Sequence, residues 1–125
     1  MLDLITLRTL RRDHPDLFYR QDWFEDEPFM DTPLQRTLSV DPLPLPSGVL
    51  SFPEVPKQWM GDLPTAVQLA DLYVRFPESP TWSRYLWCRD TDREGQRIYV
   101  GSNGKGLEIH RHLHLTSRWG VPLWL

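Results

Sequence analysis

The chain has 125 residues and a net charge of −3, with 40% hydrophobic and 25% charged residues. This length fits one domain, and the apolar share excludes a wholly disordered chain. No stretch approaches the roughly 20 apolar residues of a membrane-spanning helix, and the first residues do not resemble a secretory signal. With one cysteine the chain cannot form an intramolecular disulfide, so we expect a soluble cytoplasmic protein without membrane contact.

Charge is unevenly distributed along the chain. Residues 1–76 contain seven Lys/Arg and twelve Asp/Glu, whereas residues 77–125 contain seven and five. Nucleic-acid binders usually have a clear basic excess, because phosphate neutralisation supplies much of their affinity. The small excess in the second half does not favour a nucleic-acid partner, and the opposite charges of the two halves leave a homo-oligomer open.

Residues 1–30 are predicted to form a helical and aromatic segment. Leucines spaced three residues apart indicate a short amphipathic helix that begins near Asp3, its cap, and ends before Pro15: Leu4, Leu7 and Leu10. Leu2, Leu4 and Thr6 also alternate, so a strand is the alternative. One or two further helical turns would pack three apolar side chains inward and end at Pro28: Leu17, Phe18 and Phe24.

Residues 31–63 are predicted to form a proline-rich arm. Six prolines interrupt any regular element, and residues 41–47 alternate proline with leucine, which favours extended polyproline geometry. The arm either wraps the core and buries its leucines, or serves as a mobile ligand for a partner's aromatic groove. The leucines favour the first interpretation.

Residues 64–76 are predicted to form a helix. Five residues recur at three- and four-residue steps and define one buried stripe: Ala66, Leu69, Ala70, Tyr73 and Val74. Asp62 is the expected cap, and Pro77 ends the helix.

The period changes to two in residues 83–115. Segments 85–88, 97–100 and 107–115 alternate as strands do, with polar turns between them at 90–95 and 101–106. The elements together predict a single α+β domain, in which a small three- to four-stranded antiparallel meander packs against one or two helices.

The last predicted strand contains three histidines at alternate positions. Side chains alternate between the faces of a strand, so one polar face would hold five residues: Glu108, His110, His112, His114 and Thr116. The other face would point to the core with four residues: Leu107, Ile109, Leu113 and Leu115. Neighbouring histidines lie about 6–7 Å apart, which suits two imidazoles on one zinc or iron ion, whereas all three cannot reach one ion. Glu108, His14 or another carboxylate would supply a third ligand. The alternative is a solvated polar face without metal.

Three further motifs are predicted to be structural. Residues 90–95 resemble the start of a calcium loop, but Gly101 stands where a bidentate glutamate is needed. Residues 101–106 lack the spacing of a phosphate-binding loop and read as a turn. Cys88 is expected to be a small buried hydrophobe.

Six tryptophans are present, and the core of a small domain accounts for about four of them. In the aromatic tail, residues 116–125, three residues form a candidate partner-binding surface: Arg118, Trp119 and Trp124. Since no complete catalytic constellation is present, we expect a non-catalytic binding or adaptor protein with another protein as its partner. A metal-binding protein or metalloenzyme is the first alternative, and a weak single-stranded nucleic-acid binder is the second.

Overall fold

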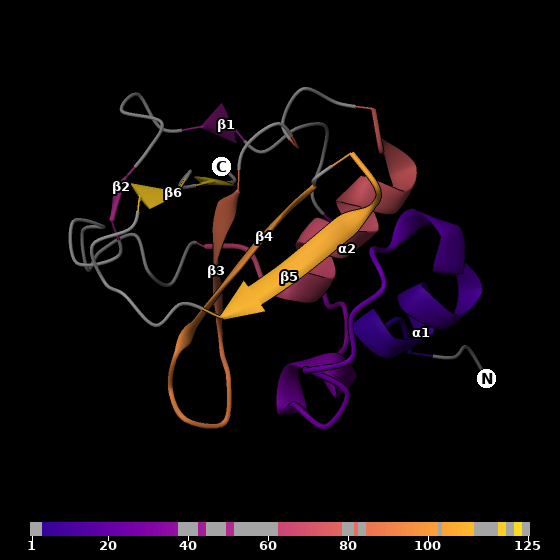
Figure 1. Ribbon diagram of the computed structural model, residues 1–125, viewed down its shortest axis with the longest axis horizontal. Helices are drawn as coiled ribbons and strands as arrows, with labels where there is room; N and C mark the ends of the chain where they lie inside the picture. The colour runs from indigo at the N-terminus through magenta and orange to yellow at the C-terminus, as the bar shows by residue number, and fades with distance from the viewer. Residues whose placement is uncertain are drawn as a thin grey trace.

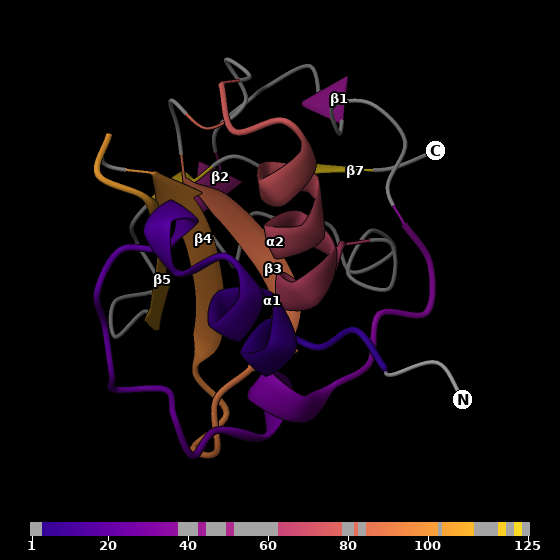
Figure 2. The same cartoon turned by 90° about the vertical axis from the view of Figure 1, so that its right-hand side faces the viewer.

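A three-stranded antiparallel sheet forms the centre of the molecule. The computed structural model describes residues 4–37, 43–44, 50–51, 63–78, 82, 85–102, 104–111, 118–119 and 122–123. The sheet has the order β3 (Leu86–Thr91), β4 (Arg97–Ser102), β5 (Leu107–Arg111). Helices α1 (Leu7–Asp13) and α2 (Ala66–Arg75) lie together on one side of it (Figures 1 and 2). The predicted α+β meander with two helices is confirmed.

Helix α1 begins three residues later than the sequence predicts. Thr6 caps it: the Thr6 hydroxyl accepts from Thr9 N at 3.2 Å, and the Thr9 hydroxyl accepts from Thr6 N at 2.9 Å. This reciprocal capping satisfies two backbone donors that the helix leaves unpaired. The predicted inward position of Leu4 is wrong, because 67% of Leu4 is exposed, and Asp3 lies outside the described residues.

The chain after α1 is extended where the sequence predicts helical turns. A short 3-10 helix, η1 (Pro15–Leu17), is followed by Phe18, which forms a parallel bridge with Leu107 of β5. A second 3-10 helix, η2 (Pro28–Asp31), ends the segment. The inward packing predicted for Phe18 and Phe24 is confirmed, since both are buried.

Residues 18–23, which we call the edge segment, close the outer edge of β5. Tyr19 N donates to the Leu107 carbonyl at 2.9 Å. The Gln21 side-chain amide then acts like a strand backbone: Oε1 accepts from Ile109 N at 2.9 Å, and Nε2 donates to the Ile109 carbonyl at 3.1 Å. The Trp23 indole N–H donates to the same carbonyl at 2.9 Å. An edge that would otherwise present unpaired backbone groups is thereby covered.

Helix α2 confirms the predicted helix, with a different cap. Thr65 and Gln68 form the capping box: Thr65 N donates to Gln68 Oε1 at 2.8 Å, and Gln68 N donates to the Thr65 hydroxyl at 3.3 Å. The Asp90 carboxylate of β3 accepts from Ala66 N, so the sheet supplies a further partner for the first turn. The cap is therefore Thr65 and not Asp62.

Alternate residues of the sheet join the helices in one hydrophobic core. Six sheet residues belong to it, all at most 2% exposed: Leu86, Cys88, Ile98, Val100, Leu107 and Ile109. Leu7 of α1 and Leu69 of α2 are completely buried in the same core. The predicted core positions of Cys88, Leu107 and Ile109 are confirmed. Leu113 and Leu115 lie outside the described residues.

Two short strand pairs connect the arm to the tail. Strand β1 (Leu43–Pro44) pairs antiparallel with β7 (Pro122–Leu123), and β2 (Leu50–Ser51) pairs antiparallel with β6 (Arg118–Trp119). The pair β2–β6 lies on the opposite side of the sheet from α2 (Figure 1). Residues 43–44 and 50–51 of the arm are thus paired within the chain, and the burial of its leucines stays a prediction. Within the described ranges, no helix has the length and apolar character needed to cross a bilayer.

Candidate functional site

The sheet face that points away from the core carries a cluster of aromatic and ionisable side chains. We call it the Glu108 cluster, and it comprises five residues: Tyr85, Trp87, Tyr99, Glu108 and His110. Register explains the grouping, because Tyr99 pairs with both Trp87 and His110, while Gly101 pairs with Glu108. The Tyr85 ring occupies the space above Gly101, where a Cβ atom would overlap it. The missing side chain at Gly101 therefore lets Tyr85 reach Glu108.

Glu108 is the hydrogen-bonding centre of this cluster. Its Oε2 accepts from the Tyr85 hydroxyl at 2.5 Å and lies 3.0 Å from His110 Nε2. Only 7% of Glu108 is exposed, so the solvated polar face that the sequence analysis offers as an alternative is wrong at this position. Burying a carboxylate is unfavourable unless it is hydrogen-bonded, and these two neighbours meet that requirement.

The rings around Glu108 hold one another in place. The His110 imidazole stacks on Tyr99, with centroids 5.2 Å apart and planes inclined by 23°. Tyr85 meets Tyr99 edge-on at 5.5 Å, and the completely buried Trp87 meets Tyr99 edge-on at 5.9 Å. Such edge-to-face pairs are favourable beyond the area that they bury.

Both tyrosines of the cluster are weak acids. Burial, followed by the hydrogen bond to Glu108, raises the pKa of Tyr85 to about 12. Burial and the negative charge of Glu108 also raise the pKa of Tyr99. Both hydroxyls therefore keep their protons at neutral pH.

The structure brings two of the four predicted metal ligands together. Glu108 and His110 are hydrogen-bonded neighbours, whereas His112 and His114 lie outside the described residues. His14, considered as a further ligand, is the exposed C-cap of α1. Among the residues that the structure describes, no three His, Cys, Asp or Glu side chains are grouped to hold a metal ion. The histidine-based site stays a prediction.

The structure describes a hydrogen-bonded turn at Asp92 and a buried Cys88, both of which the sequence predicts. Asp92 Oδ1 accepts from Glu94 N at 2.9 Å and from Gln96 N at 2.8 Å, which is the bonding of a turn. Asp90 belongs to β3 and not to the turn. Burial raises the pKa of the Cys88 thiol well above its usual range, so the thiol keeps its proton at neutral pH.

The predicted tail surface is described in its backbone alone. Arg118 and Trp119 form β6, whose partner is β2 of the arm, and Trp124 lies outside the described residues. The partner-binding role of these three residues stays a prediction.

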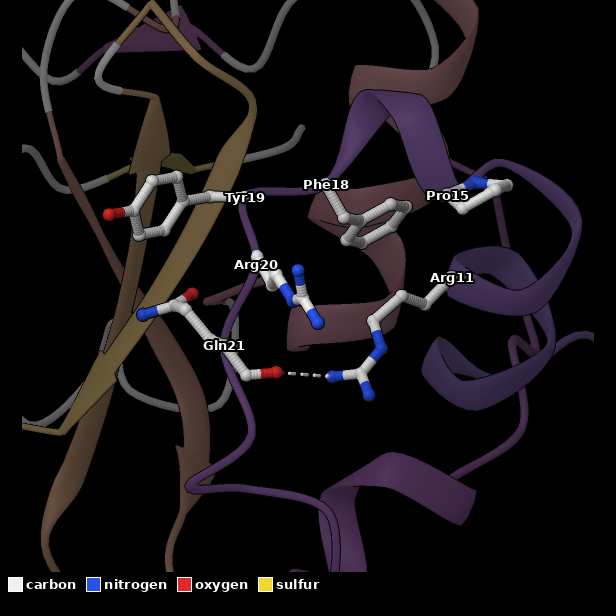
Figure 3. Close-up of a pocket in the computed structure, with 6 residues that line it drawn as sticks. All are labelled: Arg11, Pro15, Phe18, Tyr19, Arg20 and Gln21. Carbon is white, nitrogen blue, oxygen red and sulfur yellow. Dashed lines mark hydrogen bonds between the residues drawn. The ribbon is translucent and has the colours of Figure 1, made fainter.

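A second candidate site, not anticipated by the sequence analysis, lies between α1 and the edge segment. We call it the arginine cavity (Figure 3). One part has a volume of about 330 Å³ and is lined by six residues: Arg11, Pro15, Phe18, Tyr19, Arg20 and Gln21. An adjoining part of about 520 Å³ shares Arg11, Arg20 and Gln21 and adds Asp22 and Glu25. The cavity therefore combines two guanidinium groups with an apolar wall.

The two arginines differ in their partners. Arg11 Nη1 donates to the Gln21 carbonyl at 3.1 Å, and its other Nη pairs with Glu25. Arg20 is exposed and has no ion-pair partner in the part of the chain that the structure describes. Its side chain extends toward the Arg11 guanidinium (Figure 3). Because Glu25 already pairs with Arg11, Arg20 is the cation of this space that could hold an anion.

An aromatic and cationic surface continues from the cavity. Tyr19 is 37% exposed, and the Arg111 guanidinium lies 5.0 Å from the centre of the Trp23 ring. Trp23 shares the Ile109 carbonyl with Gln21 of the cavity wall. An arginine–aromatic surface is predicted in the tail. Among the described residues, Tyr19, Trp23 and Arg111 form such a surface.

No protein-family model, curated protein or solved structure matches this chain.

Proposed function

We propose that this chain is a non-catalytic binding protein whose arginine cavity receives an acidic segment of a partner protein. The observation that carries the proposal is Arg20, an exposed guanidinium directed at Arg11 across an open cavity. Guanidinium groups bind carboxylates through charge-assisted, often bidentate hydrogen bonds. A partner's Asp or Glu side chain supplies the missing counter-charge for Arg20.

The apolar wall favours a peptide over a small inorganic anion. Pro15, Phe18 and Tyr19 are among the residues that line the cavity, and an apolar side chain next to the partner's carboxylate would lose contact with water against them. Tyr19, Trp23 and Arg111 extend this surface, and tyrosine, tryptophan and arginine are enriched at protein interfaces.

The acidic residues of the cavity restrict which anion fits. Glu25 pairs with Arg11, and Asp22 lines the same space, so the two carboxylates balance the two guanidinium groups. Among the described residues, Arg20 is the guanidinium of the cavity without an ion-pair partner. A dense polyanion would bring further negative charges against these two carboxylates, and such like-charge contacts are unfavourable. This argument favours an isolated carboxylate of a peptide over a nucleic-acid backbone.

The cellular setting is part of the proposal. The one thiol, Cys88, is completely buried in the core and has no second cysteine with which to pair. A chain without disulfides suits a reducing compartment, so we place the protein in the cytoplasm.

A binding titration with three charge variants tests the proposal. The probe is a fluorescent peptide of alternating Glu and Leu, measured by anisotropy against the full chain. Arg20→Glu should weaken binding at least tenfold, because it removes the Arg20 guanidinium and introduces a negative charge that repels the carboxylates of the peptide. Arg36→Glu is the matched control, since Arg36 is exposed, lies outside the cavity lining and undergoes the same charge change.

Specificity decides between this proposal and general charge attraction. Arg36→Glu should bind the peptide about as tightly as the unaltered chain. Equal losses in both variants, or undiminished binding by Arg20→Glu, would overturn the proposal. Tighter binding of oligothymidylate than of the acidic peptide would replace it with nucleic-acid binding.

A further inference from the structure

We infer that Tyr85, Glu108 and His110 form a metal site with a phenolate, a carboxylate and an imidazole ligand, and that it selects ferric iron. The site shares no residue with the arginine cavity, so neither proposal depends on the other. It differs from the histidine pair that the sequence predicts, because its third donor comes from residue 85, directly before β3.

Two pairs of these donor atoms already have the spacing of neighbouring ligands. Glu108 Oε2 lies 2.5 Å from the Tyr85 hydroxyl and 3.0 Å from His110 Nε2. Two ligands at right angles on an ion with bonds of about 2.0–2.1 Å lie about 2.9 Å apart. A cation would replace the protons that now link these atoms. The hydroxyl proton of Tyr85, and any proton on His110 Nε2, would leave to solvent.

The surrounding sheet holds the donors in these positions. Tyr85 is confined above Gly101, and His110 is stacked on Tyr99. Glu108 is buried, whereas the His110 side chain is 35% exposed and leaves an approach for an ion and its water ligands. Sites that rest on strands and packed rings keep their geometry better than sites on loops.

The donor set favours ferric iron over zinc. A phenolate and a carboxylate are hard anionic oxygens, and hard ions prefer such ligands, whereas zinc sites are usually built from imidazole and thiolate. A metal must displace a phenol proton, whose ordinary pKa is about 10, and a trivalent ion does this more readily than a divalent one. Tyrosine serves as a ligand of haem iron in catalase, so iron–tyrosinate bonds are established protein chemistry.

Ferric nitrilotriacetate, titrated into the tag-free full chain, tests the site. We expect about one iron per chain and a visible charge-transfer band, which an iron–tyrosinate bond produces. Tyr85→Phe keeps the ring above Gly101 but removes the donor oxygen, so the band should disappear. Tyr19→Phe is the matched control, because Tyr19 is exposed and contributes no side chain to the Glu108 cluster, and it should keep the band.

Glu108→Gln provides a second, independent variant. It preserves the size of the side chain but removes the charged donor, and iron affinity should fall at least tenfold. The thermal unfolding of each variant shows whether it folds. If Tyr85→Phe does not fold, the iron affinity of Glu108→Gln still tests the site. A band that persists in Tyr85→Phe, an unchanged affinity in Glu108→Gln, or stoichiometric binding of zinc without iron would overturn the proposal.

Discussion

Glu108 shows how one side chain organises a whole face of the sheet. Its Oε2 holds Tyr85 and His110, and these two residues contact Tyr99 in turn. A buried carboxylate that loses its donors is strongly destabilising, so these contacts stabilise the fold whether or not a metal binds.

The raised pKa of Tyr85 predicts a pH-dependent stability. The phenol titrates near 10 in the unfolded chain and near 12 in the folded one, so the folded state binds more protons between these values. The contribution of Tyr85 is thus complete below pH 10 and is lost as the pH rises toward 12. Urea unfolding at several alkaline pH values should show a steeper loss of stability for the unaltered chain than for Tyr85→Phe.

Two measurements test whether the pKa of Tyr85 affects the stability of the fold. At pH 8 the Tyr85 phenol is protonated in both the folded and the unfolded chain. At this pH Tyr85→Phe should lower the free energy of unfolding by about 1–3 kcal/mol, because Glu108 loses a donor. Between pH 10 and 12 the two stability curves should converge. Parallel curves throughout that interval would show that Tyr85 titrates alike in the folded and unfolded chains.

Sequence spacing identifies Glu108 and His110 as neighbours but not their surroundings. Alternation along a strand places both side chains on one face, and the structure agrees. Tyr85 is 23 residues before Glu108, and it reaches this carboxylate through the strand register and the absence of a side chain at Gly101. Such long-range pairing leaves no periodic signal in the sequence, so the burial of Glu108 was not predictable.

At the scale of elements, the edge segment lies close to Gly106, the residue directly before β5. This residue has a φ of +132°, and a Cβ there would lie 2.6 Å from Tyr19 N and 2.8 Å from the Phe18 carbonyl carbon. Gly104, in the same hairpin turn, has a φ of +86° and nothing within 4 Å of such a Cβ. Both glycines thus have a positive φ, but only Gly106 has backbone atoms of another segment close to the position of a Cβ atom.

A pair of alanine substitutions separates the effect of the positive φ from the effect of the close contact. Gly104→Ala should lower the free energy of unfolding by about 1–2 kcal/mol through backbone strain alone. Gly106→Ala should lower it by more, because the methyl group also displaces the edge segment from β5. Chemical denaturation measures both effects, and equal losses would contradict the close contact between Gly106 and residues 18–19.

The helices and the meander were predictable because their signals are local. Alternating residues give the sheet, and three- and four-residue steps give α2. The T-x-x-Q pattern from Thr65 to Gln68 is a capping signature in the sequence, although the sequence analysis assigns the cap to Asp62. The edge segment was wrongly expected to be helical, because its pairing uses the Gln21 side-chain amide and a strand far along the chain.

At the scale of the whole molecule, distant segments meet in pairs that no local pattern indicates. The arm and the tail are treated separately in the sequence analysis, yet β1 pairs with β7 and β2 pairs with β6. Each pair involves two residues per strand, too few to show a period. Proline and tryptophan content suggested surfaces for partners, whereas the described backbone of both segments pairs within the chain.

The net charge of each half of the sequence did not indicate where the arginine cavity lies. Arg11 and Arg20 both belong to the first 76 residues, where acidic side chains outnumber basic ones. Glu25 neutralises one of the two arginines and leaves the other directed into the cavity. Under our proposal, local arrangement and not the charge balance of a segment determines where an anion binds.

Amide and arginine side-chain NMR spectra of the full chain, recorded as the Glu–Leu peptide is added, test the central claim most directly. We expect the largest shifts at the Arg20 and Arg11 side chains and at the Gln21 amide, which together border the cavity. Shifts confined to Arg118 and Trp119, or saturable binding that leaves Arg20 unmoved, would contradict the account and place the partner surface elsewhere.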